Sequence, residues 1–76
     1  MQRFGQKLRT LRLRQHMTLK DVAEATGLTA HGYISELETG KKMPTTDFVL
    51  KIARLFNVTT DQLLKDELEL DTDRFS

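Results

Sequence analysis

Residues 18–40, TLKDVAEATGLTAHGYISELETG, decide the fold of this chain. Thr18 can cap a short helix, and Asp21, three residues later, can reach back to the backbone amide of the cap as a shortened capping box. Gly27 interrupts the helical pattern, and a second short helix then runs as far as Gly40. Apolar residues fall where two helices crossing at a steep angle would bury them. The stretch therefore predicts two packed helices joined by a tight turn.

The inward side chains of this two-helix unit can hold its two helices rigidly against each other. Val22 and Ala23 face inward on the first helix, and the small Ala23 lets another helix approach closely. Leu28 fills the core beneath the turn, while Ile34 and Leu37 form the inward ridge of the second helix. The pattern predicts a helix-turn-helix, whose usual role is to place its second helix in the DNA major groove. Similar helical hairpins also occur in bundles that do not bind DNA.

Amphipathic helices flank the unit on both sides. Residues 4–15 carry Phe4, Leu8, Leu11 and Gln15 at helical spacing, and His16 takes the chain-reversing position after them. Beyond the basic loop and Pro44, which cannot continue a helix, Thr45 caps a fourth helix and Asn57 ends it. The broad apolar face of that helix consists of Phe48, Val49, Ile52, Ala53, Leu55 and Phe56.

The predicted fold is all-α, with five helices. Thr59 and Gln62 form a second capping box, which opens the short fifth helix. We expect the helical domain over residues 1–66 and an acidic tail over residues 67–76. The apolar side chains near this end belong either to a frayed tail or to a seam for a dimer or another partner; they are Leu64, Leu68 and Leu70.

Length and composition exclude several classes of protein. The 76 residues make one small domain, and the absence of cysteine excludes a disulfide framework and a cysteine zinc site. No apolar run approaches the ~20 residues of a membrane span, so we expect a cytoplasmic protein without a membrane partner. His16 and His31 lack companions at metal-ligand spacing. With no catalytic constellation and no Gly-rich phosphate loop, we expect neither an enzyme nor a cofactor.

The net charge of +1 conceals an asymmetry along the chain. The first 60 residues hold ten basic and five acidic side chains, a balance of +5, whereas the last 16 have a balance of −4. A basic body suits a polyanionic partner from which the acidic tail points away, although a solvated, charge-mixed surface explains the balance equally well. Six of the basic residues come before any acid: Arg3, Lys7, Arg9, Arg12, Arg14 and Lys20.

Four strings fall in a familiar order and spacing: FGQKLRTLRLRQHMT, DVAEATGLT, YISELETGKKMP and VLKIARLFNVTTDQLL. From about Phe4 to Leu64 the chain resembles the Cro/Xre-type phage-repressor family of five-helix, lambda-repressor-like DNA-binding domains. The resemblance implies double-stranded DNA as the partner. It also implies a sequence-specific transcriptional regulator, most often a repressor, which binds a palindromic operator as a homodimer.

The resemblance also implies roles for individual residues. Arg12 matches the family position that pairs with a glutamate at the end of the recognition helix, here Glu38, as a structural ion pair. The positions that match base-contacting residues are Thr29, Ala30, His31, Ser35 and Glu36. The positions that match phosphate-contacting residues are Thr18, Lys20, Lys41, Lys42, Thr45 and Thr46.

Two departures from the family pattern bear on this assignment. Five residues rather than four separate Gly27 from Tyr33, and Gly32 is the candidate extra residue. The family usually has Gln after the cap of the second helix, where it contacts phosphate. Here that residue is Leu19, so the contact is either lost or made by Lys20.

The outward face of the predicted reading helix is also unusual, because it carries no Arg, Lys, Gln or Asn. Glu36 could accept a hydrogen bond from cytosine N4, and His31 could donate to guanine. Thr29, which also caps this helix, and Ala30 could touch thymine methyl groups. The sequence preference would then be modest or would owe much to DNA shape.

Two other functions remain open. The same fold serves as an antitoxin that represses its own promoter and neutralises a small toxin, in which case the acidic segment 66–76 would bind that protein partner. Alternatively, a degenerate helix-turn-helix docks a protein without binding DNA, and Lys41 and Lys42 then form only a solvated loop.

Overall fold

The computed structural model describes residues 3–27 and 31–65, and in these two ranges every regular element is a helix. In chain order the helices are α1 (Phe4–Arg14), α2 (Leu19–Ala25), α3 (His31–Glu38), α4 (Thr46–Phe56) and α5 (Thr60–Leu64). The prediction of an all-α, five-helix fold is confirmed. None of the helices in the described ranges is long and apolar enough to cross a membrane.

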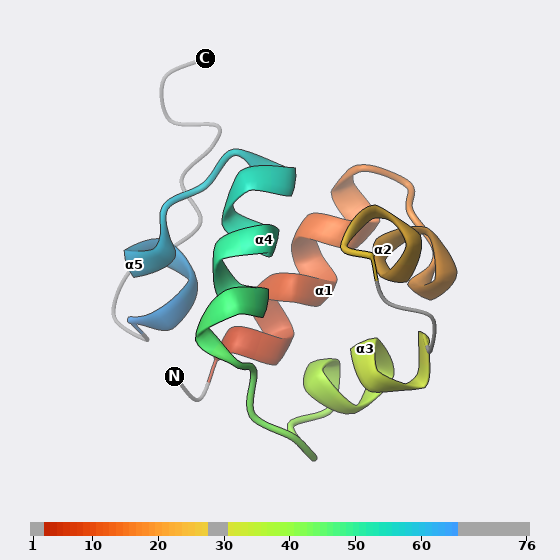
Figure 1. The fold of residues 1–76 in the computed structure, drawn as a ribbon, viewed down its shortest axis with the longest axis horizontal. Coiled ribbons are helices and arrows are strands. Elements are labelled where there is room, and N and C mark those ends of the chain that lie inside the picture. Colours follow the sequence, from red (N-terminus) through yellow and green to blue (C-terminus); the bar gives the residue numbers. More distant parts are fainter. Residues whose placement is uncertain (1–2, 28–30, 66–76) are drawn as a thin grey trace.

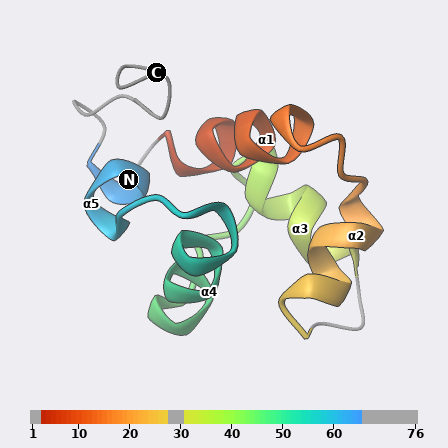
Figure 2. The ribbon, with the colours of Figure 1, turned by 90° about the horizontal axis from the view of Figure 1, so that it is seen from above.

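Helix α1 joins two parts of the molecule. It contacts α3 on one side and α5 on the other, while α2 packs on α3 and α4 packs on α5. Figure 1 shows α2 and α3 on one side of α1 and α4, with α5 on the opposite side. The perpendicular view in Figure 2 shows the same separation. The α2–α3 unit therefore projects from one end of the fold.

A single apolar core lies between these helices. Its buried members are Phe4, Leu8, Leu11, Val22, Ala23, Ile34, Leu37, Phe48, Val49, Ile52, Ala53, Val58 and Leu63. The expectation that Leu55 belongs to the buried face of α4 is wrong, because 37% of its surface is exposed. Leu55 lies at the margin of the apolar face, next to the solvent-exposed side of α4. Gln15 likewise lies just after α1 and is exposed.

The helix starts follow the predicted caps. Thr18 Oγ1 accepts a hydrogen bond from Asp21 N at 3.0 Å, and Asp21 Oδ2 accepts one from Thr18 N at 2.9 Å. Thr59 and Gln62 repeat this reciprocal capping box with both bonds at 3.0 Å. Thr45 Oγ1 accepts from the backbone three residues later at 3.1 Å. Three of the five helices therefore begin at threonines that satisfy free backbone N–H groups.

The chain reversals also fall where the sequence predicts them. His16 and Asn57 both have φ of +56°, and Gly27 and Gly40 both have φ of +81°. A left-handed residue after a helix lets the following amides bond back to its last carbonyls. The predicted core plug at Leu28 and the predicted cap at Thr29 lie outside the described residues.

Gly5 marks the closest approach of α1 to the end of α3. A Cβ atom at this position would lie 2.3 Å from the carbonyl oxygen of Leu37 and 2.7 Å from that of Glu38. Only a residue without a side chain allows the two backbones to come this close. The apolar pattern of α1 contains no signal of this contact.

Lys7 is buried, with 2% of its surface exposed. Its Nζ donates hydrogen bonds to the carbonyl oxygens of Gln62 at 2.5 Å and Lys65 at 2.7 Å. These carbonyls lie at the end of α5, where a helix has free acceptors and the negative end of its dipole. Lys7 therefore binds α5 to α1, and its inclusion among the surface charges available to a polyanion is wrong.

Candidate nucleic-acid interface

The side chain of Arg12 joins three elements around the helix-turn-helix. Its Nε donates to Glu38 Oε2 at 2.7 Å, and its Nη2 donates to Glu38 Oε1 at 3.1 Å. Its Nη1 donates to the carbonyl oxygen of Met17 at 2.9 Å. Met17 directly precedes Thr18, the cap of α2, and Glu38 is the last residue of α3. One guanidinium thus fixes the start of α2 relative to the end of α3.

This ion pair is largely shielded from solvent, because the side chains of Arg12 and Glu38 are 13% and 7% exposed. The hydrogen bond to Glu38 raises the pKa of Arg12 above its ordinary value, and the attraction of the carboxylate adds to this, while burial acts in the opposite direction. Arg12 therefore stays charged at neutral pH. Its guanidinium acts as a structural clamp and does not face the solvent.

The end of α3 folds the lysine loop back over the helix. Lys41 N donates to the carbonyl oxygen of Glu36 at 2.9 Å, and Gly40 N donates to that of Leu37 at 3.3 Å. This is a Schellman motif with Gly40 as its left-handed residue. Lys42 N also donates to the carbonyl oxygen of Glu36, at 3.3 Å. The backbone of both lysines is therefore held against the last turns of α3.

The inward face of α3 is anchored in the core. Ile34 and Leu37 are almost completely buried. Tyr33 is half-buried and meets Phe48 of α4 edge to face, with the ring centroids 5.6 Å apart and the planes at 80°. Gly32 lies inside α3 and is exposed. These contacts fix the depth and rotation of the helix, which a reading helix requires.

Two of the predicted base-contacting residues can be placed with their side chains. Ser35 and Glu36 lie on α3, and both are half-buried. Glu36 Oε1 lies 3.6 Å from Nζ of Lys42, in an ion pair that is not among the contacts expected from the sequence. Thr29 and Ala30 lie outside the described residues, and so does the side chain of His31, the residue that begins α3.

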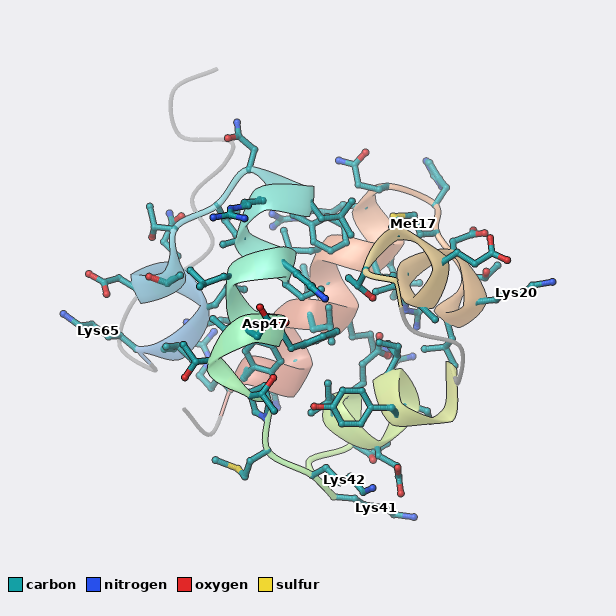
Figure 3. All side chains as sticks on the ribbon, in the orientation of Figure 1. Met17, Lys20, Lys41, Lys42, Asp47 and Lys65 are labelled. Atoms are coloured by element: carbon teal, nitrogen blue, oxygen red, sulfur yellow. The ribbon has the colours of Figure 1, made fainter. Side chains whose placement is uncertain are left out.

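The predicted phosphate-contacting residues are all exposed and come from three places in the fold. Thr18 and Lys20 lie at the start of α2, Lys41 and Lys42 lie in the loop after α3, and Thr45 and Thr46 open α4. In Figure 3, Lys20 points out from α2 and Lys41 and Lys42 point out from their loop, and α3 lies between them in this view. Cations and hydroxyls therefore border α3 on both sides.

The environment of α2 bears on the departure from the family pattern at its start. Leu19 is half-buried and packs against the core. The next residue, Lys20, is exposed. Lys20 is therefore an exposed basic residue in the first turn of α2.

Among the side chains in the described ranges, no group of three His, Cys, Asp or Glu residues could hold a metal ion. Every buried side-chain nitrogen and oxygen among these residues has a hydrogen-bond partner.

A short helix held at fixed depth, with exposed cations and hydroxyls on either side of it, defines a helix-turn-helix DNA-binding domain. The helix-turn-helix family model matches residues 8–63, and the chain belongs to this family, in its Cro/Xre-type branch. The resemblance drawn from the four sequence strings is thereby confirmed. The family consists of DNA-binding transcription regulators and not of enzymes.

Known relatives agree with this assignment. The chain is 37% identical over 66 residues to the HTH-type transcriptional regulator ImmR of Bacillus subtilis (strain 168). The aligned residues make up 86% of this chain and 51% of ImmR. The chain therefore spans about half the length of this curated relative.

Two solved structures share the fold. The N-terminal DNA binding domain of SinR from Bacillus subtilis superposes with a TM-score of 0.79 at 26% identity, over 91% of this chain and all of that one. The restriction-modification controller protein C.AhdI from Aeromonas hydrophila superposes with a TM-score of 0.73 at 27% identity, over 82% of this chain and 92% of that one.

Proposed function

We propose that this chain is the DNA-binding part of a transcriptional repressor that binds a palindromic operator as a homodimer. The observation that carries the proposal is the arrangement around α3. The Arg12–Glu38 pair fixes the helix against the start of α2, and exposed lysines border it on two sides. With α3 in the major groove, this protein would exclude other proteins from the same DNA.

The contacts divide into two kinds in this proposal. The side chains that bind phosphates set position and affinity without reading sequence; they are Thr18, Lys20, Lys41, Lys42, Thr45 and Thr46. The side chains that face base edges set sequence preference; they are Ser35 and Glu36, together with Thr29, Ala30 and His31.

The proposal of a homodimer rests on two features. Helix α3 has only eight residues, so one copy reaches few bases and a second copy is needed for tight, selective binding. An apolar hollow of about 230 Å³ lies between α4 and α5, and we propose that the second copy covers it. Its lining residues are Pro44, Thr46, Val49, Leu50, Thr60 and Leu64. Two half-sites would then lie about one helical turn, ~34 Å, apart.

Site selection from random DNA duplexes, followed by affinity measurements at two salt concentrations, tests this function. We expect a palindromic consensus and a strong fall in affinity with salt, because phosphate binding releases counterions. Binding without a consensus would contradict sequence-specific regulation, and a non-palindromic consensus bound by one copy would contradict the homodimer.

A matched pair of lysine variants locates the surface that binds. Lys41→Ala should flatten the salt dependence by about one unit of logarithmic slope per protomer, because one phosphate contact is lost. Lys65→Ala should leave the slope unchanged, because Lys65 is also exposed but lies beside α5, on the side of the molecule away from α3 (Figure 3). Equal slopes for the two variants would contradict the proposed surface.

A further inference from the structure

The Glu36–Lys42 contact links two side chains to which the sequence assigns separate roles. Glu36 Oε1 and Lys42 Nζ are 3.6 Å apart, and the side chains remain 42% and 56% exposed. One is a candidate base reader and the other a candidate phosphate contact, and both lie on the surface proposed to meet DNA. A contact of either charged group with DNA should therefore change the position of the other group.

The backbone keeps this pair together. The carbonyl oxygen of Glu36 accepts hydrogen bonds from Lys41 N at 2.9 Å and from Lys42 N at 3.3 Å. The left-handed conformation of Gly40 brings the loop back to the helix. Lys42 thus contacts Glu36 twice, through its backbone N–H and through its ammonium. Because the backbone hydrogen bond holds the loop against α3, the two charged side chains stay close together.

At a DNA surface, the lysine of this pair can offset the repulsion between the carboxylate and the phosphates. An unpaired carboxylate close to the phosphate backbone would be repelled, and the side chain would turn away from the groove. An ammonium has three N–H donors, so it can bond to a carboxylate and to a phosphate oxygen at the same time. Lys42 could therefore neutralise Glu36 and bind the backbone in one arrangement.

We propose that Lys42 is a positioning residue for sequence reading. Its ammonium bridges the carboxylate of Glu36 to a DNA phosphate and holds that carboxylate toward a base edge with a hydrogen-bond donor, the N4 amino group of cytosine. The base preference opposite Glu36 then depends on Lys42. This inference rests on the proposed function and adds a specificity role to a residue assigned only to phosphate binding.

The neighbouring lysine is a natural control. Lys41 is exposed, lies in the same loop and donates its backbone N–H to the same carbonyl oxygen. Among the residues in the described ranges it forms no ion pair with a carboxylate. Lys41 should therefore contribute to phosphate binding without affecting which base Glu36 reads.

The test compares dissociation constants for the selected operator and for operators changed at the base pair opposite Glu36. The ratio of the two constants measures discrimination. We expect Lys41→Ala to weaken binding to both DNAs equally. We expect Lys42→Ala to weaken binding and also to lower the discrimination by about two- to fivefold, the range for an exposed ion pair. Lys42→Arg should retain it, since a guanidinium can bridge the same two groups.

The double variant separates positioning from simple loss of charge. Glu36→Ala should abolish the preference for cytosine at this base pair, because it removes the acceptor oxygens. Adding Lys42→Ala to Glu36→Ala should then reduce affinity only as much as Lys41→Ala does, with no further change in discrimination. Folding of each variant is checked by circular dichroism.

Several results would overturn the inference. Unchanged discrimination in Lys42→Ala would make Lys42 a phosphate contact only, and an equal loss in Lys41→Ala would show a general effect of weaker binding. Operator selection without any preference opposite Glu36 would also reject it and leave the proposed function standing. Failure of the unmodified protein to bind DNA would reject both.

Discussion

Arg12 and Glu38 meet edge to edge across the helix-turn-helix, with Nε–Oε2 and Nη2–Oε1 distances of 2.7 and 3.1 Å. The two residues are 26 positions apart in the chain. Their contact joins the end of α1 to the end of α3, and the remaining Arg12 donor reaches the carbonyl oxygen of Met17 before α2. The geometry of the proposed reading unit therefore depends on one guanidinium.

Removing either partner of this pair should destabilise the fold. We expect Arg12→Met and Glu38→Gln each to lower the free energy of unfolding by about 2–3 kcal/mol, because the remaining group is shielded and loses its partner. Urea unfolding followed by circular dichroism measures the loss. The double variant Arg12→Met/Glu38→Gln should lose less than the sum of the single variants. Arg9→Ala, at an exposed position of α1, should change stability by less than about 0.5 kcal/mol; a similar loss there would contradict a specific role for the pair.

The same substitution at two glycines should act in opposite directions. Gly5→Ala should destabilise the protein by about 1–3 kcal/mol, because its Cβ would overlap the carbonyl oxygens at the end of α3. Gly32→Ala should stabilise it by about 0.5–1 kcal/mol, because its Cβ meets nothing within 4 Å and alanine favours a helix. Thermal unfolding of the two variants measures both effects, and a tolerated Gly5→Ala would contradict the close approach of α1 and α3.

Lys7 should contribute to stability and not to DNA binding. We expect Lys7→Met, which keeps the length of the side chain, to lower the free energy of unfolding by about 1–3 kcal/mol through the loss of charged hydrogen bonds to α5. Lys51→Met is the control, since Lys51 is exposed and forms only a surface pair with Asp47 at 3.3 Å. Chemical denaturation is measured together with the salt slope of DNA binding. A changed slope with unchanged stability for Lys7→Met would show that the side chain faces DNA.

Two capping threonines separate stability from DNA binding. Thr18→Ala and Thr59→Ala should each cost about 1 kcal/mol of stability, because each removes one half of an equivalent capping box. Only Thr18→Ala should also reduce DNA affinity, because Thr18 opens α2 beside the reading helix whereas Thr59 opens α5. Affinity is measured by fluorescence anisotropy at a temperature where both variants are folded. Equal affinities would remove Thr18 from the proposed phosphate contacts.

The features that the sequence predicts well are local. The caps at Thr18, Thr45 and Thr59 and the reversals at His16 and Asn57 depend on side chains and backbone preferences within a few residues. Such signals act in the same way wherever the helix lies in the fold. They give the starts of α2, α4 and α5 and the ends of α1 and α4.

The features that the sequence does not predict depend on distant segments. Lys7 resembles any surface lysine until α5 presents its terminal carbonyl oxygens. Gly5 looks like a weak position in a helix until the end of α3 lies against it. Leu55 matches the apolar pattern of α4, yet 37% of its surface is exposed, because periodicity does not determine how wide the buried face is.

The ion pair between Glu36 and Lys42 is a contact between a helix and a loop that nevertheless has a local sequence signal. Gly40 signals a helix end with a left-handed residue, and such an end returns the following amides to the last turn. A basic residue two positions after that glycine therefore comes back over the residue four positions before it. The pattern E-x-x-x-G-x-K, here residues 36–42, therefore contains the signal for this ion pair.

Helix α1 touches α3 on one side and α5 on the other. Substitutions on the inner face of α1 therefore disturb both ends of the molecule at once and should be rare among paralogues. The outer faces of α3 and α5 belong to different helices, so each can accumulate changes without altering the other. If α3 reads the operator as proposed, a duplicated gene can acquire a new operator preference through changes on α3 without altering the surface of α5.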